Sequence, residues 1–130
     1  MNTNCRVLVV DDSAVSRKFL ERKLAHLGYN VAAVEGGAQA LERARAAPPS
    51  VIVTDLHMPI MDGYDLCRAV RCDPALSSVI VIVTSASEVD ALDLQKARDA
   101  GAAAIVPRTA LLQEVLSALS NAIADSALLP

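Results

Sequence analysis

The sequence is poor in aromatic residues. It has no Trp, one Phe and two Tyr among 130 residues, so its core must be built from aliphatic side chains. Hydrophobic residues still make up 53% of the chain, and no segment has low complexity. This composition excludes a disordered chain, which would bury too little apolar surface to fold. The length fits a single domain with a substantial core.

The chain also lacks an excess of positive charge and any long apolar run. Its formal net charge is −3 at pH 7, whereas proteins that bind nucleic acid directly carry a basic surface. The apolar runs are far shorter than the roughly 20 residues that cross a bilayer. The first run, Val7–Val10, ends in two aspartates, unlike the apolar core of a signal peptide. We therefore expect a cytoplasmic protein without direct nucleic-acid or membrane binding.

Cysteines are few and show no metal-binding or disulfide pattern. Cys5, Cys67 and Cys72 are odd in number and have no Cys-x-x-Cys spacing. They are expected to be reduced and to pack as small apolar side chains. His26 and His57 are too isolated to complete a zinc site with them.

Two apolar runs end in acidic residues. Val7–Val10 is followed by Asp11 and Asp12, and Val51–Thr54 is followed by Asp55. Apolar runs without polar alternation are typical of buried parallel strands. Ligands of open parallel sheets bind beyond the carboxyl ends of the strands. Three carboxylates gathered there predict a site for a hard divalent cation, Mg²⁺ above all, and a pocket that handles phosphate.

Strand and helix patterns alternate five times along the chain. Five βα repeats with right-handed crossovers predict a doubly wound α/β sandwich. The strand order 2-1-3-4-5 places strands one and three side by side and so brings their aspartates together. We expect one domain over residues 1–130, with a core at about 5–124 and a short tail at 125–130. The expected strands lie at about 6–10, 30–34, 51–55, 79–83 and 104–106.

The helices have recognisable ends. The first should start after Ser13 as N-cap and stop at Gly28. The second, at about 37–46, should end before Pro48-Pro49, and the third should stop before Asp73-Pro74. On one face the first helix presents Val15, Phe19, Leu20 and Leu24, and the third carries Leu66, Cys67 and Val70.

The two remaining helices follow the fourth and fifth strands. The fourth is expected to open at Ser87, with Asp90 three residues later in a capping-box arrangement, and to end at Gly101. The fifth should start near Thr109. Its buried face is predicted to hold Leu112, Val115, Leu116, Leu119 and Ile123.

The segment Val51–Gly63, VIVTDLHMPIMDG, resembles the receiver domain of bacterial response regulators. Asp11-Asp12 some forty residues earlier and Thr84-Ser85 some thirty residues later match the same family. The resemblance extends from Val7 to about Ile123 and implies a flavodoxin-like, CheY-like fold.

The resemblance also implies roles for individual residues. Asp55 is the counterpart of the aspartate that accepts a phosphoryl group from a histidine kinase. Mg²⁺ would be held by Asp12, by Asp55, by Asp11 directly or through water, and by the backbone carbonyl of His57. The hydroxyl of Thr84 would hydrogen-bond a phosphoryl oxygen. His57 would line the mouth of the pocket, and its imidazole is not expected to bind the metal.

The residues themselves leave other interpretations open. Asp11 and Asp12 could serve only to cap the helix that follows Ser13, since acidic groups favour helix N-termini, but capping leaves Asp55 unexplained. Thr84 could be an ordinary β-branched strand residue.

Three features depart from the family pattern. Arg108 stands where the family has Lys, and Thr109 follows it in place of Pro. Arginine presents a planar fork and lysine a compact charge, so their reach to a phosphoryl group differs. Aligning Pro107 with the family proline instead would require a one-residue deletion. Ile105 occupies the position of a switching aromatic residue. The interval from Thr84 to Gly101 is slightly longer than the common pattern, which suggests an extended loop between the fourth strand and the fourth helix.

The leading hypothesis is a phosphoacceptor domain of a two-component phosphorelay, with no enzymatic activity beyond slow autodephosphorylation. Its expected partners are a sensor histidine kinase or a phosphotransfer protein and an output protein that the sequence does not identify. Stand-alone and hybrid-kinase contexts both remain open, as does a homodimer through the fourth helix, fifth strand and fifth helix.

One alternative is a degenerate receiver that acts as a constitutive interaction module. Another is a haloacid-dehalogenase-type phosphatase, which would need a second Asp where His57 stands.

Overall fold

Five parallel strands form one sheet in a computed structural model that describes residues 5–107, 117, 120 and 121. The strand order is β2-β1-β3-β4-β5, and every neighbouring pair is parallel. The predicted fold class and strand order are confirmed. The strands are β1 (Arg6–Val10), β2 (Asn30–Val34), β3 (Val51–Asp55), β4 (Ile80–Ser85) and β5 (Ala104–Pro107).

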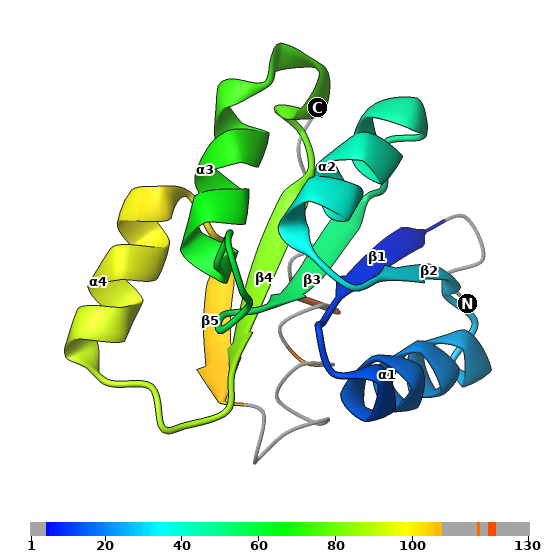
Figure 1. Cartoon of the computed structure of the whole chain (residues 1–130), viewed down its shortest axis with the longest axis horizontal. Helices are drawn as coiled ribbons and strands as arrows, with labels where there is room; N and C mark the ends of the chain where they lie inside the picture. The colour runs from blue at the N-terminus through cyan, green and yellow to red at the C-terminus, as the bar shows by residue number, and fades with distance from the viewer. Residues whose placement is uncertain (1–4, 108–116, 118–119, 122–130) are drawn as a thin grey trace.

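Helices cover both faces of the sheet (Figure 1). One face packs against α2, α3 and α4 through a cluster that includes Leu8, Ile52 and Val83. The other packs against α1 through a cluster that includes Val7 and Val53. Successive strand residues are thus buried on opposite faces, which is why the apolar runs do not alternate. The helices are α1 (Ala14–His26), α2 (Gly37–Ala46), α3 (Gly63–Cys72) and α4 (Ala91–Ala100), with a short 3₁₀ helix, η1 (Pro74–Leu76).

The ends of α1, α2 and α3 lie where the sequence predicts them. The Ser13 hydroxyl caps the first turn of α1 by accepting a hydrogen bond from the Ser16 amide. The chain then leaves α1 through Gly28, whose φ of 98° few other residues adopt. Asp73 ends α3 and at the same time caps η1, where its carboxylate accepts from the amide of Ala75.

The prediction that the fourth helix opens at Ser87 is wrong. The helix begins at Ala91, with Asp90 as N-cap. The Asp90 carboxylate accepts from the Asp93 amide at 2.8 Å, and Asp93 accepts from the Asp90 amide at 3.1 Å. The amide of Ser87 instead donates to the Ser85 hydroxyl at 3.3 Å, which holds the preceding residues in a turn. A complete capping box therefore decides the start of α4.

The expected apolar face of α1 is buried only in part. Leu24 is fully buried and Leu20 is half-buried against the β1–β3 cluster. Val15 and Phe19 are 83% and 50% exposed. Lys23 lies over the Phe19 ring, 5.7 Å from its centroid, a cation–π contact that an exposed aromatic ring allows.

The predicted fifth helix and its apolar face, Leu112, Val115, Leu116, Leu119 and Ile123, lie outside the described residues. Ser117, Ser120 and Asn121 are described, and all three are helical and exposed.

Single-domain organisation over residues 1–130 stays a prediction. Among the described residues, no helix is long and apolar enough to span a membrane.

Truncating the core should destabilise the fold far more than truncating the surface. Leu66 on α3 is fully buried, whereas Leu92 on α4 is 59% exposed. We expect Leu66→Ala to lower the free energy of unfolding by about 2–5 kcal/mol, because it leaves a cavity. Leu92→Ala should change it by less than about 0.5 kcal/mol. Urea denaturation of both variants tests this, and equal losses would contradict the core assignment.

Candidate functional site

Three carboxylates lie together at the carboxyl edge of the sheet. Asp11 and Asp12 follow β1, and Asp55 is the last residue of the adjacent β3. One carboxylate oxygen from each residue lies within 4.8 Å of the others. Asp11 and Asp55 are buried, with 4% and 5% of their surface exposed, whereas Asp12 is exposed. The predicted convergence of these three residues is confirmed, although their function is not thereby tested.

Backbone hydrogen bonds fix the position of Asp11. Its amide donates to the Val34 carbonyl at 3.1 Å, which ties it to the end of β2. Its carboxylate accepts from the amide of Ser13 at 2.9 Å, and its carbonyl accepts from the guanidinium of Arg17 at 2.8 Å. Asp11 therefore supports the start of α1, as the capping interpretation requires, and belongs to the acidic cluster as well.

The pairing of β3 with β4 fixes the position of Asp55. Asp55 lies opposite Thr84 in the sheet register, and the next amide, of Leu56, donates to the Thr84 carbonyl at 2.8 Å. The Thr84 hydroxyl is buried and donates to the Thr54 carbonyl at 3.4 Å. Ser85 beside it is also buried. Thr84 is thus the immediate neighbour of Asp55, as the sequence predicts.

Thr54 is a site-supporting residue that the sequence analysis missed. Its buried hydroxyl donates to the Asp55 carbonyl at 3.0 Å and lies 3.9 Å from the Met58 sulfur. The only signal in the sequence is a polar residue inside an apolar strand.

Gly63 closes the loop that follows Asp55. Its amide donates to the Leu56 carbonyl at 2.8 Å. A Cβ at residue 63 would lie 2.9 Å from the Asp55 carbonyl oxygen and 3.0 Å from the Leu56 Cα. Both are backbone atoms that cannot swing away, so only glycine fits without displacing the residues around Asp55.

The same loop contains a strained turn. The Met61 amide donates to the Pro59 carbonyl at 2.8 Å, closing a three-residue turn around Ile60. Ile60 has φ of 73°, close to the value of the rare γ-turn and unfavourable for a β-branched residue. Its side chain is fully exposed. Local sequence gives no signal for this conformation.

The remaining predicted site residues are only partly described. His57 is exposed in the loop after Asp55, and its carbonyl as a metal ligand stays a prediction. Arg108 lies outside the described residues. Ile105 is buried on β5 opposite Val83, in the cluster beneath α3 and α4. An aliphatic side chain therefore fills the interior at residue 105; its correspondence to the family's switching aromatic stays a prediction.

Tyr64 joins α3 to α4 next to the acidic edge, a contact that the sequence analysis missed. Its hydroxyl donates to the Asp93 carbonyl at 3.4 Å. Burial raises the pKa of the Tyr64 phenol, and the nearby carboxylates of Asp93, Asp62 and Asp90 raise it further. A negative phenolate would be both desolvated and repelled there.

The acidic cluster suits a hard divalent cation. Its donors are carboxylate oxygens, the ligand type that Mg²⁺ and Ca²⁺ prefer. Two of the three carboxylates are buried, and closely spaced negative charges repel most strongly away from water. A cation relieves that repulsion, so the residues present fit a bound Mg²⁺.

Comparison with known proteins identifies the family. The family model of the response regulator receiver domain matches residues 7–120. The chain belongs to this family. Receiver domains are signalling domains of two-component systems and not classical enzymes, and they generally bind Mg²⁺ in an acidic pocket.

Individual relatives are similar over most of this receiver domain. The response regulator MprA of Mycobacterium ulcerans is 33% identical over 112 residues, which cover 86% of this chain and 47% of MprA. A probable transcriptional regulator, ycf27 of Guillardia theta, is 36% identical over 68% of this chain and 34% of its own length. The receiver domain thus spans between a third and a half of these curated relatives.

Solved structures agree on the fold. A putative response regulator from Chloroflexus aurantiacus has a TM-score of 0.85 at 27% identity, covering 92% of this chain and 98% of that one. The receiver domain of a histidine kinase from Syntrophus aciditrophicus has a TM-score of 0.75 at 29% identity, covering 90% and 91%.

The raised pKa of Tyr64 makes stability sensitive to alkaline pH. The unfolded chain loses its phenol proton near the ordinary tyrosine pKa of about 10, and the folded chain does so at higher pH. The stabilisation that the neutral Tyr64 phenol contributes is complete below the unfolded-chain pKa of about 10. It is lost as the pH rises through the higher pKa of the folded chain. We expect Tyr64→Phe to reduce the alkaline loss of stability, measured by urea denaturation at pH 8 and 10.5. Tyr29→Phe is the control, and identical pH profiles for the two variants would refute this.

Proposed function

We propose that this receiver domain accepts a phosphoryl group at Asp55 from a histidine kinase or a phosphotransfer protein. The observation that carries the proposal is the position of the Asp55 carboxylate, buried within 4.8 Å of Asp11 and Asp12 and opposite Thr84. Phosphoryl transfer depends more on positioning and charge neutralisation than on a strong nucleophile. A carboxylate held in place by the strand pairing meets that requirement.

The transfer is a simple displacement at phosphorus. A carboxylate oxygen of Asp55 forms the new O–P bond while the P–N bond of the donor phosphohistidine breaks. The electron pair of that bond returns to the imidazole nitrogen, which takes up a proton from solvent. The product is an acyl phosphate on Asp55, and Thr84 lies beside it to hydrogen-bond a phosphoryl oxygen.

Asp11, Asp12, Asp55 and the His57 carbonyl would hold the cation. When bound, Mg²⁺ supplies positive charge next to the transferred phosphoryl group. The cluster brings three negative charges to this edge, so without compensation it would repel an incoming phosphate. Arg108 is proposed as the second source of positive charge, where the family has a lysine.

Output is proposed to pass through the segment between β4 and α4. Thr84 lies in β4, and residues 86–90 connect that strand to the capped start of α4. The charge gained at Asp55 would bias this segment between two conformations through its contact with Thr84. The signal would then reach another protein by surface contact, in a cytoplasmic setting. The names of the curated relatives, response regulator and transcriptional regulator, are compatible with such an output.

Replacing the acceptor should abolish phosphorylation. Incubation with acetyl phosphate and Mg²⁺ should add one phosphoryl mass to the wild-type chain and none to Asp55→Asn, as measured by intact mass spectrometry. Asp99→Asn, which removes an exposed carboxylate on α4, is the matched control and should label normally. Labelling of Asp55→Asn to the wild-type level would rule out Asp55 as the acceptor.

Removing one acidic ligand should weaken Mg²⁺ binding. Asp12 is exposed, so Asp12→Asn leaves the core intact while it removes a full negative charge from the cluster. We expect its Mg²⁺ dissociation constant to rise about tenfold or more, which corresponds to about 1.4 kcal/mol. Isothermal titration calorimetry measures this, again with Asp99→Asn as control. An unchanged affinity would remove Asp12 from the proposed ligands.

A second candidate function is a constitutive interaction module that binds its partner regardless of phosphorylation. The observation that favours it is the burial of Ile105, which packs into the core on β5 and has no ring to move. Such a module would keep the acidic cluster but would respond weakly to phosphorylation.

The two candidates differ in their response to a phosphate mimic. With Mg²⁺ and beryllofluoride, a working switch should shift the NMR amide resonances of residues 84–93. The constitutive module predicts that the changes stay confined to the residues around Asp55. Asp55→Asn, which cannot bind the mimic, supplies the baseline for both.

A further inference from the structure

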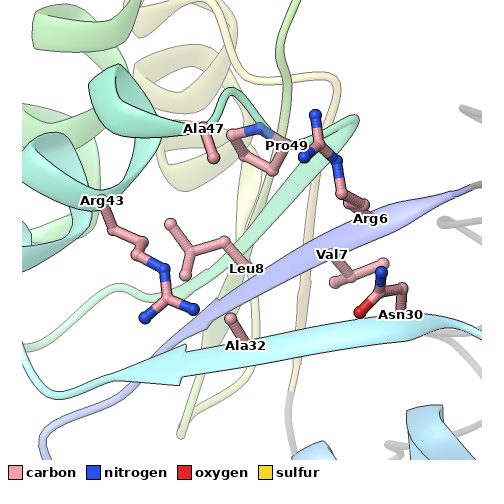
Figure 2. A pocket seen from close by; sticks show the side chains of 8 residues that line it. All are labelled: Arg6, Val7, Leu8, Asn30, Ala32, Arg43, Ala47 and Pro49. Carbon is pink, nitrogen blue, oxygen red and sulfur yellow. The ribbon is translucent and has the colours of Figure 1, made fainter.

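A hollow of about 210 Å³ lies across β1 and β2, beneath the C-terminal end of α2. Figure 2 shows its side chains, which come from these two strands, from α2 and from the segment that follows α2. It is lined by the amino-terminal residues of β1, whereas the acidic cluster lies beyond the carboxyl ends of β1 and β3. This hollow is thus separate from the proposed phosphorylation site.

The floor of the hollow follows from the strand register. Leu8 pairs with Ala32, and Arg6 pairs with Asn30, so these four residues form two adjacent rows across β1 and β2. Leu8 is fully buried, whereas Ala32 is half-buried. Because Ala32 has only a methyl group, it leaves apolar surface uncovered between β2 and α2.

Two arginines contribute positive charge to this apolar floor. Arg43 extends from α2 with its guanidinium directed toward Ala32 (Figure 2). This guanidinium makes no hydrogen bond or ion pair with any residue in the described part of the chain. Arg6 donates to the Pro48 carbonyl at 2.8 Å through one of its nitrogens. Among the residues that the structure describes, no acidic side chain lines the hollow, although the chain as a whole has a net charge of −3.

We propose that this hollow binds a small organic carboxylate with a short hydrocarbon chain. The Arg43 guanidinium matches a carboxylate as a planar two-point donor. The hydrocarbon part would cover Ala32 and Ala47, where it displaces water from apolar surface. A carboxylate with a hydrocarbon chain is favoured over inorganic phosphate because part of the lining is apolar, and phosphate has no apolar part to cover it. Asn30 adds an amide at the rim.

Titration with 3-methylbutanoate, followed by amide NMR without Mg²⁺, tests the proposal. We expect saturable shifts centred on Ala32, Arg43 and Ala47. The neutral 3-methylbutanamide should bind at least fivefold more weakly, since it lacks the charge. Inorganic phosphate should also bind at least fivefold more weakly, since it lacks the apolar part. Equal binding of all three compounds, or shifts centred on Asp55, would overturn the proposal.

Two matched substitutions locate the binding charge. Arg43→Gln should weaken 3-methylbutanoate at least fivefold, whereas Arg22→Gln, the same change at an exposed residue of α1 on the opposite face, should alter affinity less than twofold. Ala47→Leu should also weaken binding, because it fills the hollow from an exposed position. Equal effects of the two arginine substitutions would refute the site. Acetyl phosphate labelling of Asp55 should be unchanged in Arg43→Gln, so this test is independent of the proposed phosphorylation.

Discussion

Repulsion among three carboxylates is the constraint on which the functional edge of this domain depends. Parallel pairing of β1 with β3 brings Asp11, Asp12 and Asp55 within 4.8 Å of one another. Burial of two of them strengthens the repulsion, because water no longer screens it. The folded chain tolerates this cost because two hydrophobic layers hold the central strands in register. The surrounding residues then serve to fix three groups that would otherwise move apart.

Much of this arrangement could be predicted from the sequence because it follows from short-range patterns. Unbroken apolar runs identified strands buried on both faces, and the aspartates at their ends marked the edge where a site would form. Other features depend on competition that a sequence does not resolve. Ser87 and Asp90 are both good N-caps, and Asp90 prevails because Asp93 completes a reciprocal pair with it. The γ-turn at Ile60 depends on how the chain returns to Gly63.

The contact between α3 and α4 shows a further limit of sequence analysis. Tyr64 reaches the Asp93 backbone across 29 residues of sequence, and no local pattern reports such a meeting. The same region contains Ile105, whose importance the sequence did suggest through its departure from the family. In the structure, the aromatic ring near α4 is that of Tyr64 on α3, and the aliphatic side chain is that of Ile105 on β5. Any movement of α4 would therefore act on the Tyr64 hydrogen bond and on the packing around Ile105 together.

The distance along the chain between the acidic residues has a consequence for folding. Asp12 and Asp55 are some forty residues apart, so the cluster exists only after β3 has paired with β1. A cation at this site would bind the folded chain and have no comparable site in the unfolded one. It would therefore stabilise the domain in proportion to the logarithm of its concentration once the site is saturated. During synthesis, a nascent chain whose β3 residues have not yet left the ribosome is not stabilised by the cation. The site forms only when the central strands pair.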